Sequence, residues 1–133
     1  MKKTLTLLIC LICYQILCHA QVADEHYYFK NLSVQNGLSQ NTVNTILQDK
    51  QGFMWFGTKD GLNRYDGLSF RKFKHDDRSQ RSIGNNFITA LYEDEKGSIW
   101  VGTDVGLYIY YPEKDSFEHF TKQSVENTRI EHT

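Results

Sequence analysis

Two acidic clusters hold the residue types that could transfer protons or bind a cation. His75–Asp77 places an imidazole beside two carboxylates, a combination suited to general acid–base chemistry. Glu93–Glu95 places three carboxylates in a row, and calcium prefers such oxygen ligands. The first cluster lies in the polar stretch KHDDRSQRS, and the second lies in a turn next to Lys96. We therefore interpret both as solvated loop residues, because charged loops form without any catalytic role.

Other patterns for catalysis or cofactor binding do not occur in the sequence. There is no His-x-x-x-His pair, no Gly-x-Ser-x-Gly elbow and no phosphate-binding Gly-Lys-Ser/Thr loop. The histidines beyond residue 20 are widely spaced: His26, His75, His119 and His132. All three cysteines lie before residue 20: Cys10, Cys13 and Cys18. The sequence therefore predicts no metal, no cofactor and no catalytic residue, in a chain that is not itself an enzyme.

Three tyrosines near the C-terminus allow two interpretations. Tyr108, Tyr110 and Tyr111 could stack on a sugar ring. Tyr108 and Tyr110 would also share one face of a strand, where they could simply pack. The residues that would contact a ligand therefore stay unknown at this point.

The elements that must position these residues are repeated at an interval of 45 residues. GFMWFGTKDGLNRYD, residues 52 to 66, returns as GSIWVGTDVGLYIYY, residues 97 to 111. This period lies within the range of about 40–50 residues found for propeller repeats. The match continues upstream, where Asn41, Val43, Ile46 and Asp49 align with Asn86, Ile88, Leu91 and Asp94. The repeat signature consists of Trp55, Gly57, Thr58, Gly61, Leu62 and Tyr65 in the first copy, and Trp100, Gly102, Thr103, Gly106, Leu107 and Tyr110 in the second.

Each copy contains four short stretches typical of β-strands. They are TVNTILQ, FMWFG, LNRY and SFRKF in the first copy, and FITALYE, SIWVG, LYIY and SFEHF in the second. Asp49–Gly52 and Asp94–Gly97 fit turns in which the aspartate side chain bonds to the backbone. Lys59–Gly61 fits a tight hairpin, and Asp104–Gly106 fits one less cleanly.

We therefore predict an all-β fold built from β-propeller blades. One four-stranded antiparallel blade is expected at about 41–73 and a second at about 86–121. A leading strand is expected at about 27–32, because Phe29 and Leu32 show the spacing of the last strand in each blade. Since propellers close with typically 4 to 8 blades, we expect an incomplete propeller from a longer protein.

The stacking of blades explains several residues of the signature. Blades are apolar on both faces, so Trp55 and Trp100 are expected to fill the space between neighbours. Gly57 and Gly102 are expected at close approaches or bulges. The second blade should expose an apolar face and favour aggregation.

The N-terminus has the pattern of a secretory signal peptide at residues 1–20. Lys2 and Lys3 precede an apolar run, and small residues precede a cleavage point after Ala20. A retained anchor and a lipoprotein signal are the alternatives. Cleavage would change the formal charge from −1 to −3, since two lysines are removed. We expect an exported, periplasmic segment that binds no nucleic acid, because such binding needs clustered Lys and Arg.

The pattern V-x-x-I-x-x-D-x-x-G-x-M-W-F-G-T-x-x-G-L-x-x-Y-D over Val43–Asp66 resembles the two-component regulator propeller repeat. Ile88–Tyr110 resembles it again. Two residues depart from the first copy: Val105 replaces the turn residue Asp60, and Tyr111 replaces the acidic residue Asp66. The opening NLSVQNGLSQNTVNTILQD is similar to the start of periplasmic sensors in hybrid two-component systems of polysaccharide-degrading gram-negative bacteria.

The resemblance implies a histidine kinase in the full-length protein, preceded by propellers that bind an oligosaccharide. It also implies further blades and sensor domains as partners, a membrane span downstream and a possible homodimer. The phosphotransfer residues would lie in domains that this sequence does not contain. The resemblance therefore implies a sensory module that signals through a phosphorelay and regulates transcription for polysaccharide use.

Two other classes of protein remain as alternatives. The repeats could belong to a propeller enzyme, such as a quinoprotein dehydrogenase or a polysaccharide lyase, or to a plain interaction scaffold. The fold itself does not decide between a sensor, an enzyme and a scaffold.

Overall fold

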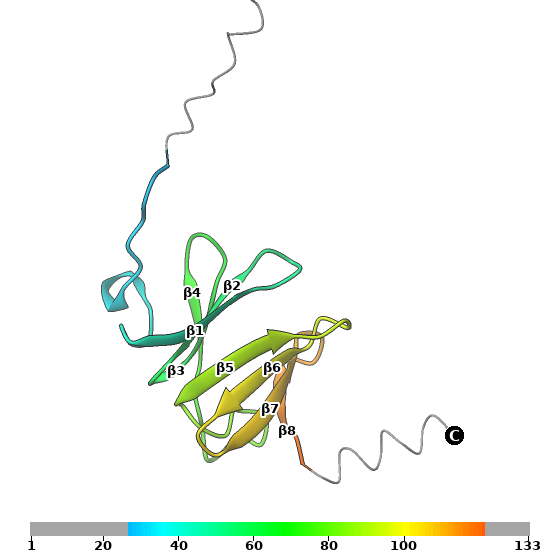
Figure 1. Cartoon of the computed structure of the whole chain (residues 1–133). Helices are drawn as coiled ribbons and strands as arrows, with labels where there is room; N and C mark the ends of the chain where they lie inside the picture. The colour runs from blue at the N-terminus through cyan, green and yellow to red at the C-terminus, as the bar shows by residue number, and fades with distance from the viewer. Residues whose placement is uncertain (1–26, 122–133) are drawn as a thin grey trace, which may run out of the picture. The chain divides into compact units, whose positions relative to one another are not determined.

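The computed structural model describes residues 27–121, in which the chain forms two four-stranded antiparallel sheets that lie side by side (Figure 1). The first sheet follows a short 3₁₀ turn, and the second begins after a 14-residue connection. The elements are η1 (Val34–Asn36), β1 (Val43–Gln48), β2 (Met54–Thr58), β3 (Gly61–Tyr65) and β4 (Phe70–Phe73), then β5 (Ile88–Glu93), β6 (Ile99–Thr103), β7 (Gly106–Tyr111) and β8 (Ser116–His119). The prediction of an all-β fold with two four-stranded blades is confirmed.

Each sheet is a meander in which consecutive strands are neighbours. The strand order is β1-β2-β3-β4 in the first sheet and β5-β6-β7-β8 in the second. Thr58 pairs with Gly61, and Thr103 pairs with Gly106, so both central hairpins have two-residue loops. Gly61 and Gly106 have φ of 118° and 150°, values that glycine adopts without the steric penalty of a side chain. The tight hairpins predicted at these two places are therefore present.

One face of the first sheet packs on one face of the second. Residues paired across neighbouring strands share a face, which places Trp55, Leu62 and Phe73 together on the side toward the second sheet. The second sheet contributes Ile88, Ile99, Val101, Tyr110 and Phe117 to the same buried cluster. The ring centroids of Trp55 and Tyr110 are 5.5 Å apart, and those of Phe73 and Phe117 are 5.6 Å apart. The hydrophobic core of the molecule is thus the junction between the two sheets.

The two signature tryptophans differ in burial, in line with the apolar face expected to be exposed on the second sheet. Trp55 is 1% exposed, as expected for a residue between blades. Trp100 occupies the equivalent place on the outer face of the second sheet, where it is only partly buried and packs edge-on against Phe120. Within residues 27–121 no sheet lies over that face, and the neighbouring Tyr92 is 63% exposed.

The leading strand expected at about 27–32 stays a prediction, because the blade that it would complete is not among the described residues. Residues 27–32 have no strand assignment, and neither sheet of the described region extends to them. A strand needs a hydrogen-bonded neighbour, which aromatic spacing alone does not supply. The predicted signal peptide at 1–20 lies outside the described residues. Among residues 27–121 no helix is long and apolar enough to cross a membrane.

At one pair of equivalent positions in the repeat, the two copies carry different residues that pack together. In the first sheet the side chains of Ser39 and Asn63 bond to each other, with Asn63 Nδ2 2.8 Å from Ser39 Oγ. The repeat places Gly84 and Tyr108 at these positions in the second copy. A Cβ added to Gly84 would lie 1.8 Å from the Tyr108 hydroxyl oxygen. The larger tyrosine therefore requires the glycine.

Gly84→Ser is expected to destabilise the protein by about 1–3 kcal/mol, because it overpacks the site that the tyrosine fills. The double variant Gly84→Ser/Tyr108→Asn recreates the pair of the first sheet and should recover part of that loss. Urea denaturation of the two single variants and the double variant measures the coupling between the positions. Purely additive losses would contradict the inferred exchange.

Candidate functional site

The residues of the repeat signature do not gather into one catalytic cluster; they hold the turns and strands on which the junction depends. Trp55, Thr58 and Leu62 are buried in the first sheet, and Gly57 lies beside them. Their equivalents, Trp100, Gly102, Thr103, Gly106 and Leu107, are only partly buried in the second sheet, whereas Tyr110 is 1% exposed at the junction. In residues 27–121 no three His, Cys, Asp or Glu side chains lie together as ligands for a metal ion.

An aspartate joins the first turn of each sheet to its tryptophan. Asp49 Oδ1 accepts hydrogen bonds from the backbone N–H groups of Gln51 and Phe53, at 3.0 and 2.9 Å. Asp49 Oδ2 accepts the indole N–H of Trp55 at 2.7 Å. The turn predicted from the Asp-x-x-Gly spacing is confirmed. The bond to the indole was not predicted, although the constant spacing of six residues between aspartate and tryptophan is its signal.

The second sheet repeats this arrangement. Asp94 Oδ1 accepts from the N–H groups of Lys96 and Ser98, both at 2.9 Å, and Asp94 Oδ2 accepts the Trp100 indole N–H at 3.0 Å. Burial acts to raise the pKa of the Asp94 carboxyl, but the bonds from Trp100 and the two backbone groups outweigh it and lower the pKa. The carboxylate is therefore held in its charged form.

The Gly-Thr-x-x-Gly part of the signature closes the central hairpin. Thr58 Oγ1 donates to the carbonyl of Gly61 at 2.8 Å, and Thr103 Oγ1 donates to the carbonyl of Gly106 at 2.9 Å. Each hydroxyl also accepts a loop N–H. Each threonine thus satisfies the backbone of a loop that is too short to satisfy itself.

The two sheets approach each other closely at Gly57. A Cβ added there would lie 2.6 Å from Ile88 Cγ2 of the second sheet, so the predicted close approach is confirmed. The bulge lies opposite, in β1, where Asn44 is the extra residue between the Val43 and Thr45 pairs. Asn44 Nδ2 donates to the Ile88 carbonyl at 2.8 Å, so the bulge aims a side chain across the junction.

At one end of the junction, the first turn of the first sheet bonds to its counterpart in the second. The backbone N–H of Lys50 donates to Glu93 Oε2 at 2.9 Å. Its ammonium group donates to the carbonyls of Asp94 and Glu95 at 2.7 and 3.1 Å. Lys50 of the neighbouring sheet thus bonds to all three residues of the acidic cluster. Asp94 and Glu95 are turn residues as interpreted, whereas Glu93 is the last residue of β5.

An ion pair links the sheets at the same end of the junction. Arg71 in β4 donates to Asp115 Oδ2 at 2.6 Å, and the Tyr110 hydroxyl donates to Asp115 Oδ1 at 2.8 Å. These two bonds lower the pKa of the Asp115 carboxyl. Burial, with the Asp115 bond, raises the pKa of Tyr110 to about 12, so the hydroxyl remains a donor.

Asp115 has no equivalent in the first sheet, because the last hairpin of the second sheet is longer than that of the first. Tyr65 pairs with Phe70 in the first sheet, whereas in the second sheet Tyr110 pairs with Phe117 and an added pair, Tyr111 with Ser116, extends the ladder. In the first sheet Asp66 caps the turn by accepting from the N–H groups of Leu68 and Ser69. The departure noted at Tyr111 thus marks an extension of the strand.

The cluster His75–Asp77 orders the connection between the sheets. His75 Nδ1 lies 2.9 Å from the Ile83 carbonyl, and Nε2 lies 2.7 Å from Asp77 Oδ1. Both partners can only accept, so both ring nitrogens donate when the ring is charged. The bond to Ile83, followed by that to Asp77, raises the pKa of His75. His119 stacks on Tyr108, while His26 and His132 lie outside the described residues.

The three tyrosines pack against protein groups. Tyr108 is partly buried against the core, and Tyr110 lies in it. The Lys114 ammonium lies over the ring of Tyr111, 4.7 Å from its centroid. The packing alternative therefore accounts for these rings in the described region.

Asp49→Ala is expected to destabilise the protein by about 1–3 kcal/mol more than Asp94→Ala. Both changes remove the same turn bonds, but only the Trp55 indole N–H would be left without a partner in the core. Trp100 is partly exposed and can bond to water. Urea denaturation compares the two variants, and Asp49→Asn, which keeps an acceptor, should be milder. Equal losses for the two alanine variants would show that the indole bond has no special weight.

The His75 ring is expected to titrate above its ordinary value of 6.5. A raised pKa in the folded protein adds stability that is fully present below pH 6.5 and is lost as the pH rises through the folded value. An NMR titration of the ring measures this midpoint. In Asp77→Asn the midpoint should fall toward 6.5 while the bond to Ile83 remains. A midpoint below 6.5 in the unmodified protein would refute the charged donor arrangement.

Comparisons with known proteins agree with this geometry. The two-component regulator propeller model matches residues 37–60 and 82–105. Histidine kinase P4 of Formosa agariphila is 40% identical over 60 residues, which are 45% of this chain and 4% of that protein. The chain therefore spans a small part of its relative.

Two solved structures from B. thetaiotaomicron share the arrangement. The extracellular domain of the hybrid two-component system BT3049 is 38% identical, with a TM-score of 0.65, over 72% of this chain and 14% of that one. The extracellular domain of the one-component system BT4673 has a TM-score of 0.57 over 78% of this chain and 14% of that one; at 24% identity it supports the fold alone. Each sheet therefore carries one match to the two-component regulator propeller repeat, which spans its first two strands.

Proposed function

We propose that this chain belongs to the ligand-sensing propeller of a hybrid two-component sensor with a histidine kinase. The observation that carries the proposal is the 38% identity to an extracellular domain of such a system, over 72% of the chain and with the same sheets. The propeller would bind a glycan breakdown product in the periplasm. The N-terminal sequence, with two lysines before an apolar run, supports export.

The junction between the sheets is a suitable place for a signal to begin. The core, the Asn44 bond and the Arg71–Asp115 ion pair all cross it. A ligand that contacts both sheets stabilises their packed arrangement, by a free energy that grows with the logarithm of its concentration relative to its Kd. Binding at such a junction can therefore be passed on as a change in how the sheets pack.

The partly exposed outer face of the second sheet supports further sheets as partners. Tyr92 and Trp100 lie on it, at the places that Leu47 and Trp55 take at the covered junction. A sheet of the same repeat would bury them as the second sheet buries Trp55. Pairing of two such sensors in a homodimer would bring the proposed kinase regions together downstream, and that region would also hold the membrane span.

The proposed function is tested on the full-length protein encoded at the locus. Its transcript should continue into a membrane span and a kinase, and the protein in membrane vesicles should change its autophosphorylation when oligosaccharides are supplied. A panel of glycan digests, with each matched undigested polysaccharide as control, identifies the class of ligand. Turnover of an oligosaccharide without any phosphorylation response would favour the enzyme alternative and contradict the sensor.

A further inference from the structure

Four residues at one end of the junction do not follow the repeat. Most junction positions keep their residue type from one copy to the next, whereas these combine an aromatic ring, two cations and a carboxylate. Phe53, Arg64 and Arg71 are replaced by Ser98, Ile109 and Glu118 at the equivalent strand positions, and Asp115 lies in the hairpin extension that the first sheet lacks. Because the fold is built by the repeated residues, these exceptions need a separate explanation.

The two arginines lie directly opposite each other in the first sheet. Arg64 and Arg71 are cross-strand partners in β3 and β4, and both face the second sheet. Like charges in this position repel each other. Asp115 accepts a bond from Arg71 at 2.6 Å, whereas the Arg64 guanidinium makes no side-chain hydrogen bond or ion pair with residues 27–121 and acts on Asp115 only through its charge. Two guanidinium groups therefore share one carboxylate.

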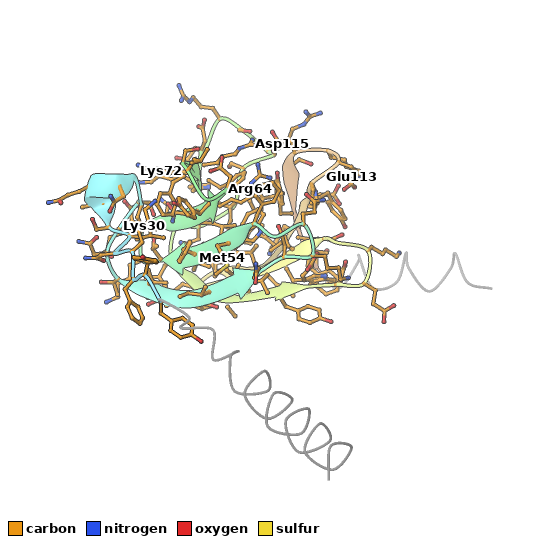
Figure 2. The ribbon with its side chains drawn as sticks, turned by 90° about the horizontal axis from the view of Figure 1, so that it is seen from above. Lys30, Met54, Arg64, Lys72, Glu113 and Asp115 are labelled. Carbon is orange, nitrogen blue, oxygen red and sulfur yellow. The ribbon has the colours of Figure 1, made fainter. Side chains whose placement is uncertain are left out.

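Arg64 is held in place by aromatic rings instead. Its Cζ atom lies 4.4 Å from the centroid of the Phe53 ring and 5.8 Å from that of Trp55. Stacking uses the flat face of a guanidinium and leaves its N–H donors, which lie in the plane, free to bond. Arg64 is near enough to Asp115 for its charge to lower the pKa of that carboxyl, and both residues are labelled in Figure 2. Lys72, next to Arg71 in β4, lies on the opposite face of the first sheet.

We propose that Arg64 and Arg71, supported by Phe53, form a binding site for a carboxylate or sulfate group carried by a small saccharide. Planar N–H donors match the paired oxygens of such groups and form short, charge-assisted bonds with them. The inference rests on the proposed sensing function for the saccharide, and it adds that the saccharide is acidic. The anion would neutralise the positive charge that remains when one carboxylate, Asp115, faces two arginines. It would bridge β3 and β4 beside the second sheet.

The site is tested by NMR on the full chain, with glucuronate and glucose 6-sulfate as probes and glucose as the neutral match. Both acidic probes are expected to shift the Arg64 side-chain N–H signal, and glucose is not. Arg64→Gln should weaken their binding by about tenfold, the loss expected for one charge-assisted bond. Lys72→Gln removes a nearby cation from the other face and should change the binding less than about twofold, since it leaves the site intact.

The outcomes separate this site from the proposed function. Binding that survives Arg64→Gln, or that Lys72→Gln weakens equally, would overturn the site, since general attraction to a cationic surface would explain it. Inorganic sulfate serves as a further probe; binding as tight as that of glucose 6-sulfate would support the anion site but contradict recognition of the saccharide. Thermal melts of each variant identify loss of folding. Because no kinase is needed, anion binding can fail or succeed independently of the phosphorylation response.

Discussion

Both faces of each four-stranded sheet carry apolar side chains, and the rest of the structure depends on covering them. Trp55 is almost completely buried because Tyr110 of the second sheet and Phe73 of its own sheet enclose it. Trp100 has the same bonds to its own turn, yet it stays partly exposed where the described region provides no third sheet. Aromatic rings of this size contribute most of the apolar area that a small sheet can bury. The repeat is therefore a unit of stacking, and one sheet alone is an incomplete structure.

The turns of both repeats help to position the rings that pack between the sheets, because the same residues recur at the same spacing. A single carboxylate, Asp49 or Asp94, bonds to the backbone of the first turn with one oxygen and to the tryptophan indole with the other. The turn thereby fixes the ring that packs at the junction. The threonine of the central hairpin, Thr58 or Thr103, acts in the same way on a two-residue loop. The signature residues thus couple local turn geometry to contacts between sheets.

The sequence predicted the architecture well because the strands, hairpins and aspartate turns are local features with a fixed period. Two kinds of feature were beyond it. The bond from the Trp55 indole to Asp49 was one: the constant six-residue spacing is a signal for it, but the contact itself depends on how the two side chains meet across the folded turn. The pairing of residues 27–32 was the second, because a strand needs a partner in space and aromatic spacing carries no information about one.

The junction was also only partly predictable. The glycine at 57 pointed to a close approach, but the bulge that turns Asn44 toward Ile88 became visible only in the paired strands. The ion pair between Arg71 and Asp115 depends on the added strand pair of Tyr111 and Ser116, which appears in the sequence only as a departure from the repeat.

Departures from a repeat are informative because the repeated positions already account for the fold. The exchange of Ser39 and Asn63 for Gly84 and Tyr108 preserves packing, since the glycine makes room for the ring. The charged departures are compensated only in part, by the Arg71–Asp115 ion pair and by the stacking of Arg64 on Phe53. Arg64 and Arg71 oppose each other although repulsion acts against that pairing, and Asp115 meets only one of them. The second copy of the repeat has isoleucine and glutamate at these positions and forms a sheet with the same strand order, so the arginines are not required by the architecture. Their placement at the end of a junction, where a ligand would contact both sheets, therefore makes them the part of this region best suited to recognition.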